Sequence, residues 1–151
     1  MTRPPWLTKD GSLDLGKFPI DGVLAQALRQ DQEAFRSALT LLYSMQRGGR
    51  REAGIVLLGL LAECPDDWSK RIEIVKALDG FHTRGCAGVL FSEVRRVTSS
   101  NTTRRYLAAV LDALSSMPRE LVDHELEILG EDTRFSYRMR EKFRWLAGRA
   151  P

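Results

Sequence analysis

The sequence lacks the features that mark several large classes of protein. It contains only two cysteines in 151 residues, too few for a scaffold held together by disulfides. No apolar run approaches the roughly 18 residues that span a bilayer, and the first residues have no apolar core of the signal-peptide type. Hydrophobic residues make up 43% of the chain and charged residues 28%, which excludes a disordered or collagen-like polymer. These absences predict a soluble, cytoplasmic protein with reduced thiols.

Recognisable arrangements of catalytic or metal-binding residues are also missing. His82 and Cys86 form the only local pair of metal-ligand residue types, but they lack the paired spacing of a structural zinc site. We expect Cys86 to be a packed thiol instead. Neither histidine adjoins a recognisable nucleophile, and no nucleophile elbow or phosphate-binding glycine loop occurs. The sequence therefore predicts a protein that is not an enzyme and that has no cofactor or metal.

The positive charge of the chain is concentrated at its end. Residues 134–151 contain six basic residues and one acid, a local charge of +5. Because the whole chain carries +3, the remaining residues carry −2. A basic surface is therefore expected at the last helix rather than along the whole protein.

An internal repeat organises most of the sequence. The segments 40–45, 76–81 and 112–117 follow one another at intervals of 36 residues. Aligning them produces four apolar columns at helical spacing, which predict the buried stripe of an amphipathic helix in each copy. The columns are Ala38, Ile74 and Val110; Leu39, Val75 and Leu111; Leu42, Leu78 and Leu114; and Met45, Phe81 and Met117.

A second type of helix alternates with the first, because residues 53–57 resemble residues 87–91 at a spacing of 34. The predicted helices are 21–29, 31–46, 50–63, 66–81, 83–98, 101–117, 119–130 and 133–148. A single helix pair is too small to bury its own apolar stripe, so neighbouring pairs must stack on one another. The sequence thus predicts an all-α fold, a right-handed α-solenoid of about four antiparallel helix pairs.

The first residues differ from the rest. Residues 1–20 mix aromatic residues with prolines and turn residues, which predicts an irregular N-terminal arm. We expect Trp6 and Phe18 to pack the arm over the first helix pair; the alternative is a detached peptide that engages a partner. Residues 21–151 form the predicted helical repeat domain.

The second predicted helix pair resembles the HEAT and armadillo class of repeats. It has Asp67, then Arg71, Ile74 and a closing Ala77-Leu78, which is similar to the acidic turn, basic residue and Ala-Leu ending of HEAT repeats. The third pair keeps only Ala113-Leu114, and the fourth keeps little beyond the spacing. The resemblance implies a non-catalytic role in binding, in which second helices line a concave surface that grips another protein. A minority of HEAT-like proteins bind nucleic acid instead.

Arginines recur near the start of the second helices. Arg71, Arg104 or Arg105, and Arg138 are about 33 residues apart. Stacked pairs would bring them into one row, which suits an acidic protein surface or a phosphate backbone. The alternative is a structural ladder, in which each arginine pairs with a turn acid such as Asp132.

The last helix combines positive charge with aromatic residues. Its helical spacing predicts that Phe135, Met139, Phe143 and Leu146 are buried. It leaves Tyr137, Arg140, Arg144 and Trp145 nearer to solvent. Aromatic and arginine side chains on one exposed face are typical of protein-binding hot spots. A solvated capping face is the alternative.

These patterns predict a non-catalytic protein–protein interaction module, an adaptor or regulatory binding protein. It would use the second-helix face and the basic last helix to bind a partner with an acidic or mixed-charge surface. The expected partner-binding residues are Arg71, Arg104, Arg105, Tyr137, Arg138, Arg140, Arg144 and Trp145. The alternative is a nucleic-acid-binding repeat protein that contacts phosphates through the six arginines of this set.

Overall fold

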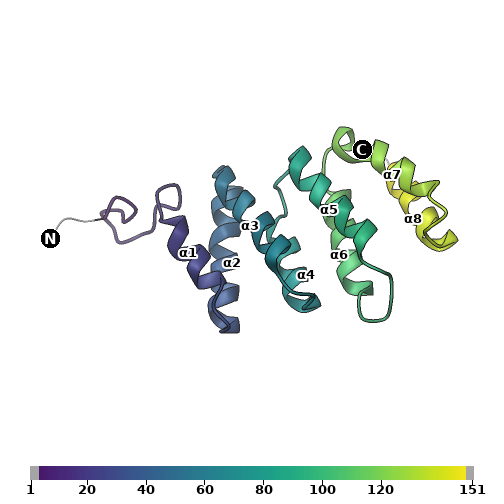
Figure 1. Cartoon of the computed structure of the whole chain (residues 1–151). Helices are drawn as coiled ribbons and strands as arrows, with labels where there is room; N and C mark the ends of the chain where they lie inside the picture. The colour runs from purple at the N-terminus through teal and green to yellow at the C-terminus, as the bar shows by residue number, and fades with distance from the viewer. Residues whose placement is uncertain (1–3, 149–151) are drawn as a thin grey trace. The chain divides into compact units, whose positions relative to one another are not determined.

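The computed structural model describes residues 4–148, and these residues form eight helices (Figure 1). The helices are α1 (Ile20–Ala27), α2 (Gln32–Arg47), α3 (Arg51–Glu63), α4 (Trp68–Ala77), α5 (Arg84–Arg96), α6 (Arg104–Ser115), α7 (Arg119–Gly130) and α8 (Tyr137–Gly148). The only pairing of β type among residues 4–148 is an isolated bridge between Leu7 and Leu13. The all-α prediction is confirmed, and each predicted helix is present.

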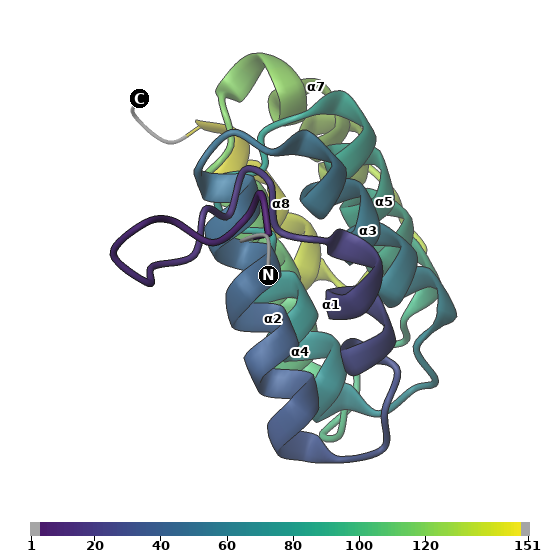
Figure 2. The same cartoon turned by 90° about the vertical axis from the view of Figure 1, so that its left-hand side faces the viewer.

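The chain divides into two compact units, one ending at Phe81 and the other beginning at His82. Residues 4–20 of the predicted arm belong to the first unit, and the predicted repeat domain extends over both units. In that unit α1 packs on α2, α3 packs on α2 and α4, and α2 and α4 lie side by side (Figure 2). In the second unit α6 and α7 each pack on α5, and α8 packs on α7.

The arm is attached to the rest of the first unit through Arg50, the residue before α3. The Arg50 guanidinium Nη1 donates hydrogen bonds to the backbone carbonyls of Leu15 and Phe18. Within the arm, the rings of Trp6 and Phe18 meet edge to face with their centroids 5.0 Å apart. The arm is therefore held by polar contacts to its backbone, which the aromatic pattern did not predict. Residues 1–3 of the predicted arm lie outside the described residues.

The core includes all of the predicted apolar columns. All twelve column residues are buried, each no more than 6% exposed. Leu78, Phe81 and Met117 are buried although they follow the ends of their helices. The 36-residue period therefore reflects which residues are buried, and the buried positions include residues that follow the ends of the regular helices.

A buried polar cluster joins α5 to α6 in the second unit. The Tyr106 hydroxyl is inaccessible to solvent and donates a 2.6 Å hydrogen bond to Oε1 of Glu93. Arg96 forms an ion pair with the same carboxylate at 2.8 Å. Burial of a carboxylate requires such partners, because an unpaired buried charge is strongly destabilising.

Candidate functional site: a basic groove between α6 and α8

A groove of about 320 Å³ lies between α6 and α8, the second helices of the last two pairs. Its apolar lining comes from Leu107, Ala108 and Leu111 of α6 and from Met139 of α8. Its charged lining comes from Arg104, Arg138 and Lys142, and no acidic residue lines it. We call this the α6–α8 groove.

The three cations of the α6–α8 groove are available to a ligand. Arg104, Arg138 and Lys142 are exposed, and their side chains form no hydrogen bond or ion pair with any residue from 4 to 148. Three cations around one groove repel one another, and an anionic group placed among them would relieve that repulsion. The groove therefore favours a ligand that carries negative charge.

A second hollow, of about 290 Å³, adjoins the groove and shares four of its lining residues. We call it the apolar hollow, because Val94, Val97, Leu107, Phe135 and Met139 line it. The shared residues are Ser99, Leu107, Ser136 and Met139. The two cavities therefore offer adjoining sites on the same face of the second unit.

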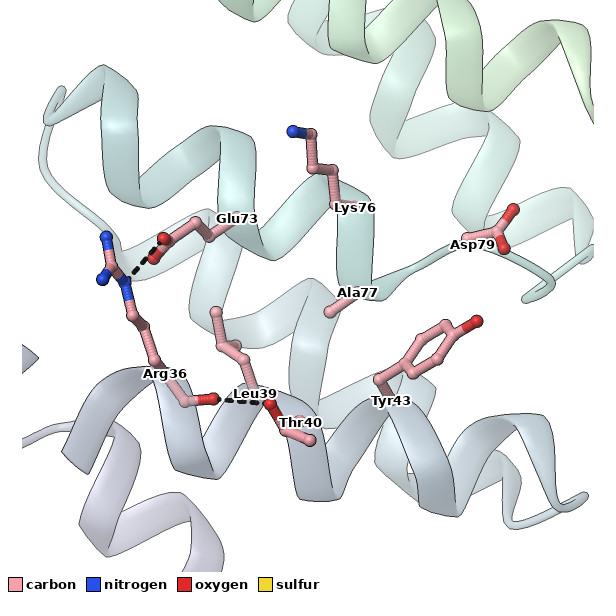
Figure 3. Close-up of a pocket in the computed structure, with 8 residues that line it drawn as sticks. All are labelled: Arg36, Leu39, Thr40, Tyr43, Glu73, Lys76, Ala77 and Asp79. Atoms are coloured by element: carbon pink, nitrogen blue, oxygen red, sulfur yellow. Dashed lines mark hydrogen bonds and ion pairs between the residues drawn. The ribbon is translucent and has the colours of Figure 1, made fainter. Parts of the chain in front are cut away.

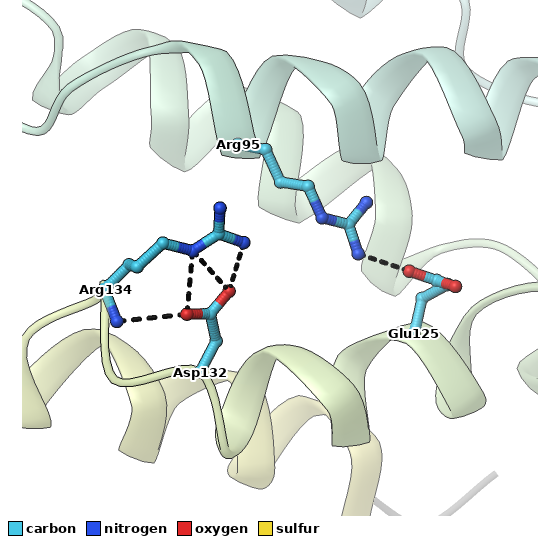
Figure 4. Close-up of polar contacts among 4 residues, drawn as sticks. All are labelled: Arg95, Glu125, Asp132 and Arg134. Carbon is cyan, nitrogen blue, oxygen red and sulfur yellow. Dashed lines mark hydrogen bonds and ion pairs between the residues drawn. The ribbon is translucent and has the colours of Figure 1, made fainter.

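The arginines of the apolar hollow are already paired with acids. Arg95 of α5 forms an ion pair with Glu125 of α7, and Arg134 forms one with Asp132 at 2.7 Å (Figure 4). Asp132 also accepts a hydrogen bond from the Arg134 backbone N–H. Hydrogen bonds from Arg134 lower the pKa of Asp132 from 3.8 to about 2, so this carboxylate stays charged. The apolar hollow consequently has little uncompensated charge.

Of the predicted partner-binding residues, the structure brings Arg104 and Arg138 together at this groove. Tyr137 and Trp145 are 68% and 69% exposed on α8, as expected of an accessible face. Arg105 is exposed on α6 but does not line the groove. Lys142 was not among the predicted residues, although its position one turn after Arg138 could have indicated it.

Arg71 does not belong to an exposed row, and this part of the prediction is wrong. Its side chain is buried, with a relative exposure of 3%. Its Nη1 donates to the carbonyls of Leu61 and Cys64 at 3.0 and 2.7 Å, at the end of α3. Arg71 thus satisfies carbonyls that a helix end leaves without partners.

The remaining two predicted arginines are only partly exposed. Arg144 forms ion pairs with Glu141 and Glu131, and its stem lies against Gly130. Arg140 is half-buried, and its Nε is buried. Arg104, Arg105 and Arg138 do not form the ion pairs of the alternative structural ladder among residues 4–148; Asp132 pairs with Arg134 instead.

A further groove, of about 410 Å³, lies in the first unit between α2 and α4 (Figure 3). An ion pair of 2.9 Å between Arg36 and Glu73 bridges the two helices at one end. Lys76, Tyr43 and Asp79 lie along the rest of this α2–α4 groove. Its charges are mixed, in contrast to the uniformly basic α6–α8 groove.

No known protein family matches this chain. A search of curated proteins and a search of solved structures also find no match. The interpretation of the site therefore depends on its own geometry.

Residues 4–148 contain no group of three or more side chains suited to hold a metal ion, and none of their helices is both long and apolar enough to cross a membrane. Cys86 is fully buried, and burial raises the pKa of its thiol from 9.0 to about 12. Because the thiolate is the reactive form, Cys86 is a poor nucleophile.

Proposed function

We propose that this chain is a non-catalytic binding module that recognises another protein through its second helices and the basic helix α8. The observation that supports the proposal best is the α6–α8 groove, where three cations without partners surround an apolar lining. An apolar lining with charged side chains at its edge is the usual composition of a protein-binding patch. The proposed partner has an acidic or mixed-charge surface.

We further propose that the helix pairs stack as a right-handed, HEAT-like α-solenoid. The supporting observations are the burial of all twelve column residues and the contact between the two helices of each consecutive pair. In such a stack the second helices share one face, and both grooves lie between second helices. A cytoplasmic location fits the reduced state expected of Cys64 and Cys86, both of which are free thiols.

Nucleic-acid binding is the second candidate, because the same cations could contact phosphates. Burial of Arg71 and the ion pairs of Arg144 remove two of the six arginines on which that reading depends. The apolar lining of the groove also suits the apolar side chain of a protein better than a phosphate backbone. We therefore favour a protein partner.

The experiment is affinity capture from source cells with the tagged full-length chain, with and without nuclease treatment. The comparison variant is R104E/R138E/K142E, which reverses the charge of the α6–α8 groove. We expect one stoichiometric protein that survives nuclease. Recovery of nucleic acid alone, with all protein lost after nuclease, would refute the proposal and favour the second candidate.

A further inference from the structure

The α6–α8 groove and the apolar hollow differ in charge although both contain basic residues. In the groove, Arg104, Arg138 and Lys142 have no partner among residues 4–148. In the hollow, Glu125 and Asp132 neutralise the two arginines (Figure 4). One cavity thus demands negative charge from a ligand, and the other does not.

The residues that line the apolar hollow suit a bulky apolar side chain. The apolar hollow is lined by Val94 in the last turn of α5, by Val97 just after that helix, and by the half-buried ring of Phe135. The sulfur-containing side chain of Met139 lines both the hollow and the groove. Methionine adapts to differently shaped apolar groups, so this wall suits a bulky side chain.

Helix α8 places three groups on one of its faces. Arg138, Lys142 and Trp145 are spaced by four and three residues, which is the spacing of one helix face. Arg138 and Lys142 line the groove, and Trp145, which is 69% exposed, follows them on the same face. A ligand that lies along α8 would therefore meet two successive cations and then an aromatic ring.

We infer that these two cavities bind a short acidic segment of a partner protein that carries one bulky apolar residue. This inference rests on the proposed function and specifies its partner. Carboxylates of the segment pair with Arg104, Arg138 and Lys142, and the apolar side chain enters the hollow beside Met139. The apolar residue fixes the register of the segment, and the carboxylates fix its orientation.

Charge complementarity distinguishes this site from the α2–α4 groove. There, Glu73 already neutralises Arg36, and Lys76 shares the lining with Asp79. A strongly acidic segment would meet carboxylates at that groove and be repelled. The preference for acidic segments should therefore belong to the second unit alone.

The test is selection of random peptides, displayed on phage, against the full-length chain. Enriched peptides should contain two or more Asp or Glu residues at a fixed distance from one Leu, Ile, Met or Phe. A labelled synthetic peptide of the enriched sequence is then titrated by fluorescence anisotropy. R104E/R138E/K142E should weaken its binding by about tenfold or more, since three attractive pairs become repulsive.

The matched control is K17E/R51E/R84E, which makes the same change in net charge with one lysine and two arginines. All three control residues are exposed, and none lines either cavity of the second unit. Binding should change by less than about twofold, because none of the three control side chains lines a cavity where the peptide binds. Circular dichroism establishes that both triple variants remain folded.

The position of the apolar residue is tested by photo-crosslinking. Replacing that residue of the peptide by benzoylphenylalanine should yield adducts on Met139, Phe135 or Val97, as read by mass spectrometry. Replacing it by asparagine should abolish binding.

Several results would overturn the inference. They are the absence of any enriched peptide, enrichment of neutral or basic peptides, equal losses in the two triple variants, and adducts on the α2–α4 groove. Tighter binding of a single-stranded oligonucleotide that R104E/R138E/K142E abolishes would also overturn it. If a partner captured from cells binds the native chain but not R104E/R138E/K142E, and no acidic peptide is enriched, the inference fails while the proposed function stands. If neither partner nor peptide binds, both fail.

Discussion

Two glycines at equivalent places in α3 and α5 have opposite surroundings. A Cβ added at Gly54 would lie 2.5 Å from the ring of the buried Phe81, whereas one added at Gly88 would meet nothing within 4 Å. Alanine favours a helix by about 1 kcal/mol over glycine. We expect Gly88→Ala to raise the free energy of unfolding by about 0.5–1 kcal/mol. Gly54→Ala should lower it by about 1–2 kcal/mol, because overpacking outweighs helix propensity.

Urea denaturation of both variants measures the difference. Gly59→Ala provides a control within α3, because a Cβ there also meets nothing within 4 Å. A Gly54→Ala protein as stable as the Gly59→Ala protein would show that Phe81 does not need the space that Gly54 leaves.

Burial of the Cys86 thiol should make the stability of the folded chain depend on pH in the alkaline range. The pKa of this thiol is about 12 in the folded chain and 9.0 in an ordinary environment. Because the folded pKa is raised, its contribution to stability is complete below pH 9 and is lost as the pH rises through 12. The free energy of unfolding of the native chain should thus fall more steeply between these limits than that of Cys86→Ala.

The measurement is urea denaturation across this pH range, with Cys64→Ala as the control. Cys64 is only half-buried. At neutral pH a thiol reagent should modify Cys64 in the folded chain and Cys86 only after unfolding. If the free energy of unfolding changes with pH in the same way for the native chain and for Cys86→Ala, the alkaline loss of stability does not come from the Cys86 thiol.

Individual arginines mark where sequence reasoning reached its limit. The spacing of Arg71, Arg104 and Arg138 is real, but spacing does not say what a guanidinium meets. Arg71 follows a helix whose terminal carbonyls, at Leu61 and Cys64, face it, so it is buried as a backbone partner. Arg104 and Arg138 meet no such carbonyls and remain exposed. Only the packed structure separates these two outcomes.

At the scale of helices, α4 depends on a side chain of α2 to complete its end. The Gln46 amide Nε2 donates to the carbonyls of Ala77 and Asp79, and Gln46 is 6% exposed. Gln46→Met keeps the size of the side chain but leaves these carbonyls without that donor. We expect it to lower the free energy of unfolding by about 1–3 kcal/mol.

Thermal and urea denaturation of Gln46→Met provide the measurement. Gln26→Met is the comparison, because Gln26 donates a single hydrogen bond, to the carbonyl of Ala34, at a half-buried site. Gln26→Met should therefore lower the free energy of unfolding by less than Gln46→Met does. If the two variants lose the same free energy of unfolding, the buried hydrogen bonds at the end of α4 contribute no more to stability than the half-buried one of Gln26.

Helix existence was predictable from the apolar period, whereas helix starts depended on local hydrogen bonds. Helix α8 begins at Tyr137 rather than at 133. The Asp132 carboxylate accepts a hydrogen bond from the Arg134 N–H, and the Ser136 hydroxyl accepts one from the Met139 N–H. Helix α6 begins at Arg104 rather than at 101, because the Thr103 hydroxyl is bonded to the carbonyl of Thr98. Such short polar contacts compete with the first helical turn.

The candidate site was predictable only in part. Periodicity placed Arg104 and Arg138 near the starts of second helices, and both line the α6–α8 groove. The apolar hollow could not be predicted, because it depends on how Phe135 and Met139 pack beside Val97. A sequence pattern locates residues on a helix face, but a cavity depends on the distance between helices.

For the whole molecule, the concentration of charge at the C-terminal end determines how binding should respond to salt. Residues 134–151 carry +5 and the remainder carries −2. Three unpaired cations at the groove predict that affinity for an acidic protein partner falls by about tenfold from low to physiological salt. Duplex binding with six or more phosphate contacts would lose about a thousandfold or more.

Titrations at several salt concentrations, performed with the native chain and R104E/R138E/K142E, provide the measurement. In the variant the affinity should no longer fall with salt and should rise slightly, because the three pairs become repulsive and salt screens the repulsion. If the fall in affinity persists unchanged there, the responsible charges lie outside the α6–α8 groove.

Helices that contact one another in each unit are sequence neighbours or next neighbours, as α2 with α4 and α5 with α7. Few distant segments must find each other before packing begins, so little loop-closure entropy opposes the search. Helical proteins with such local contacts fold in microseconds to milliseconds. The same 36-residue period that buries the core therefore also makes the chain a fast folder, with apolar helix faces exposed only briefly after synthesis.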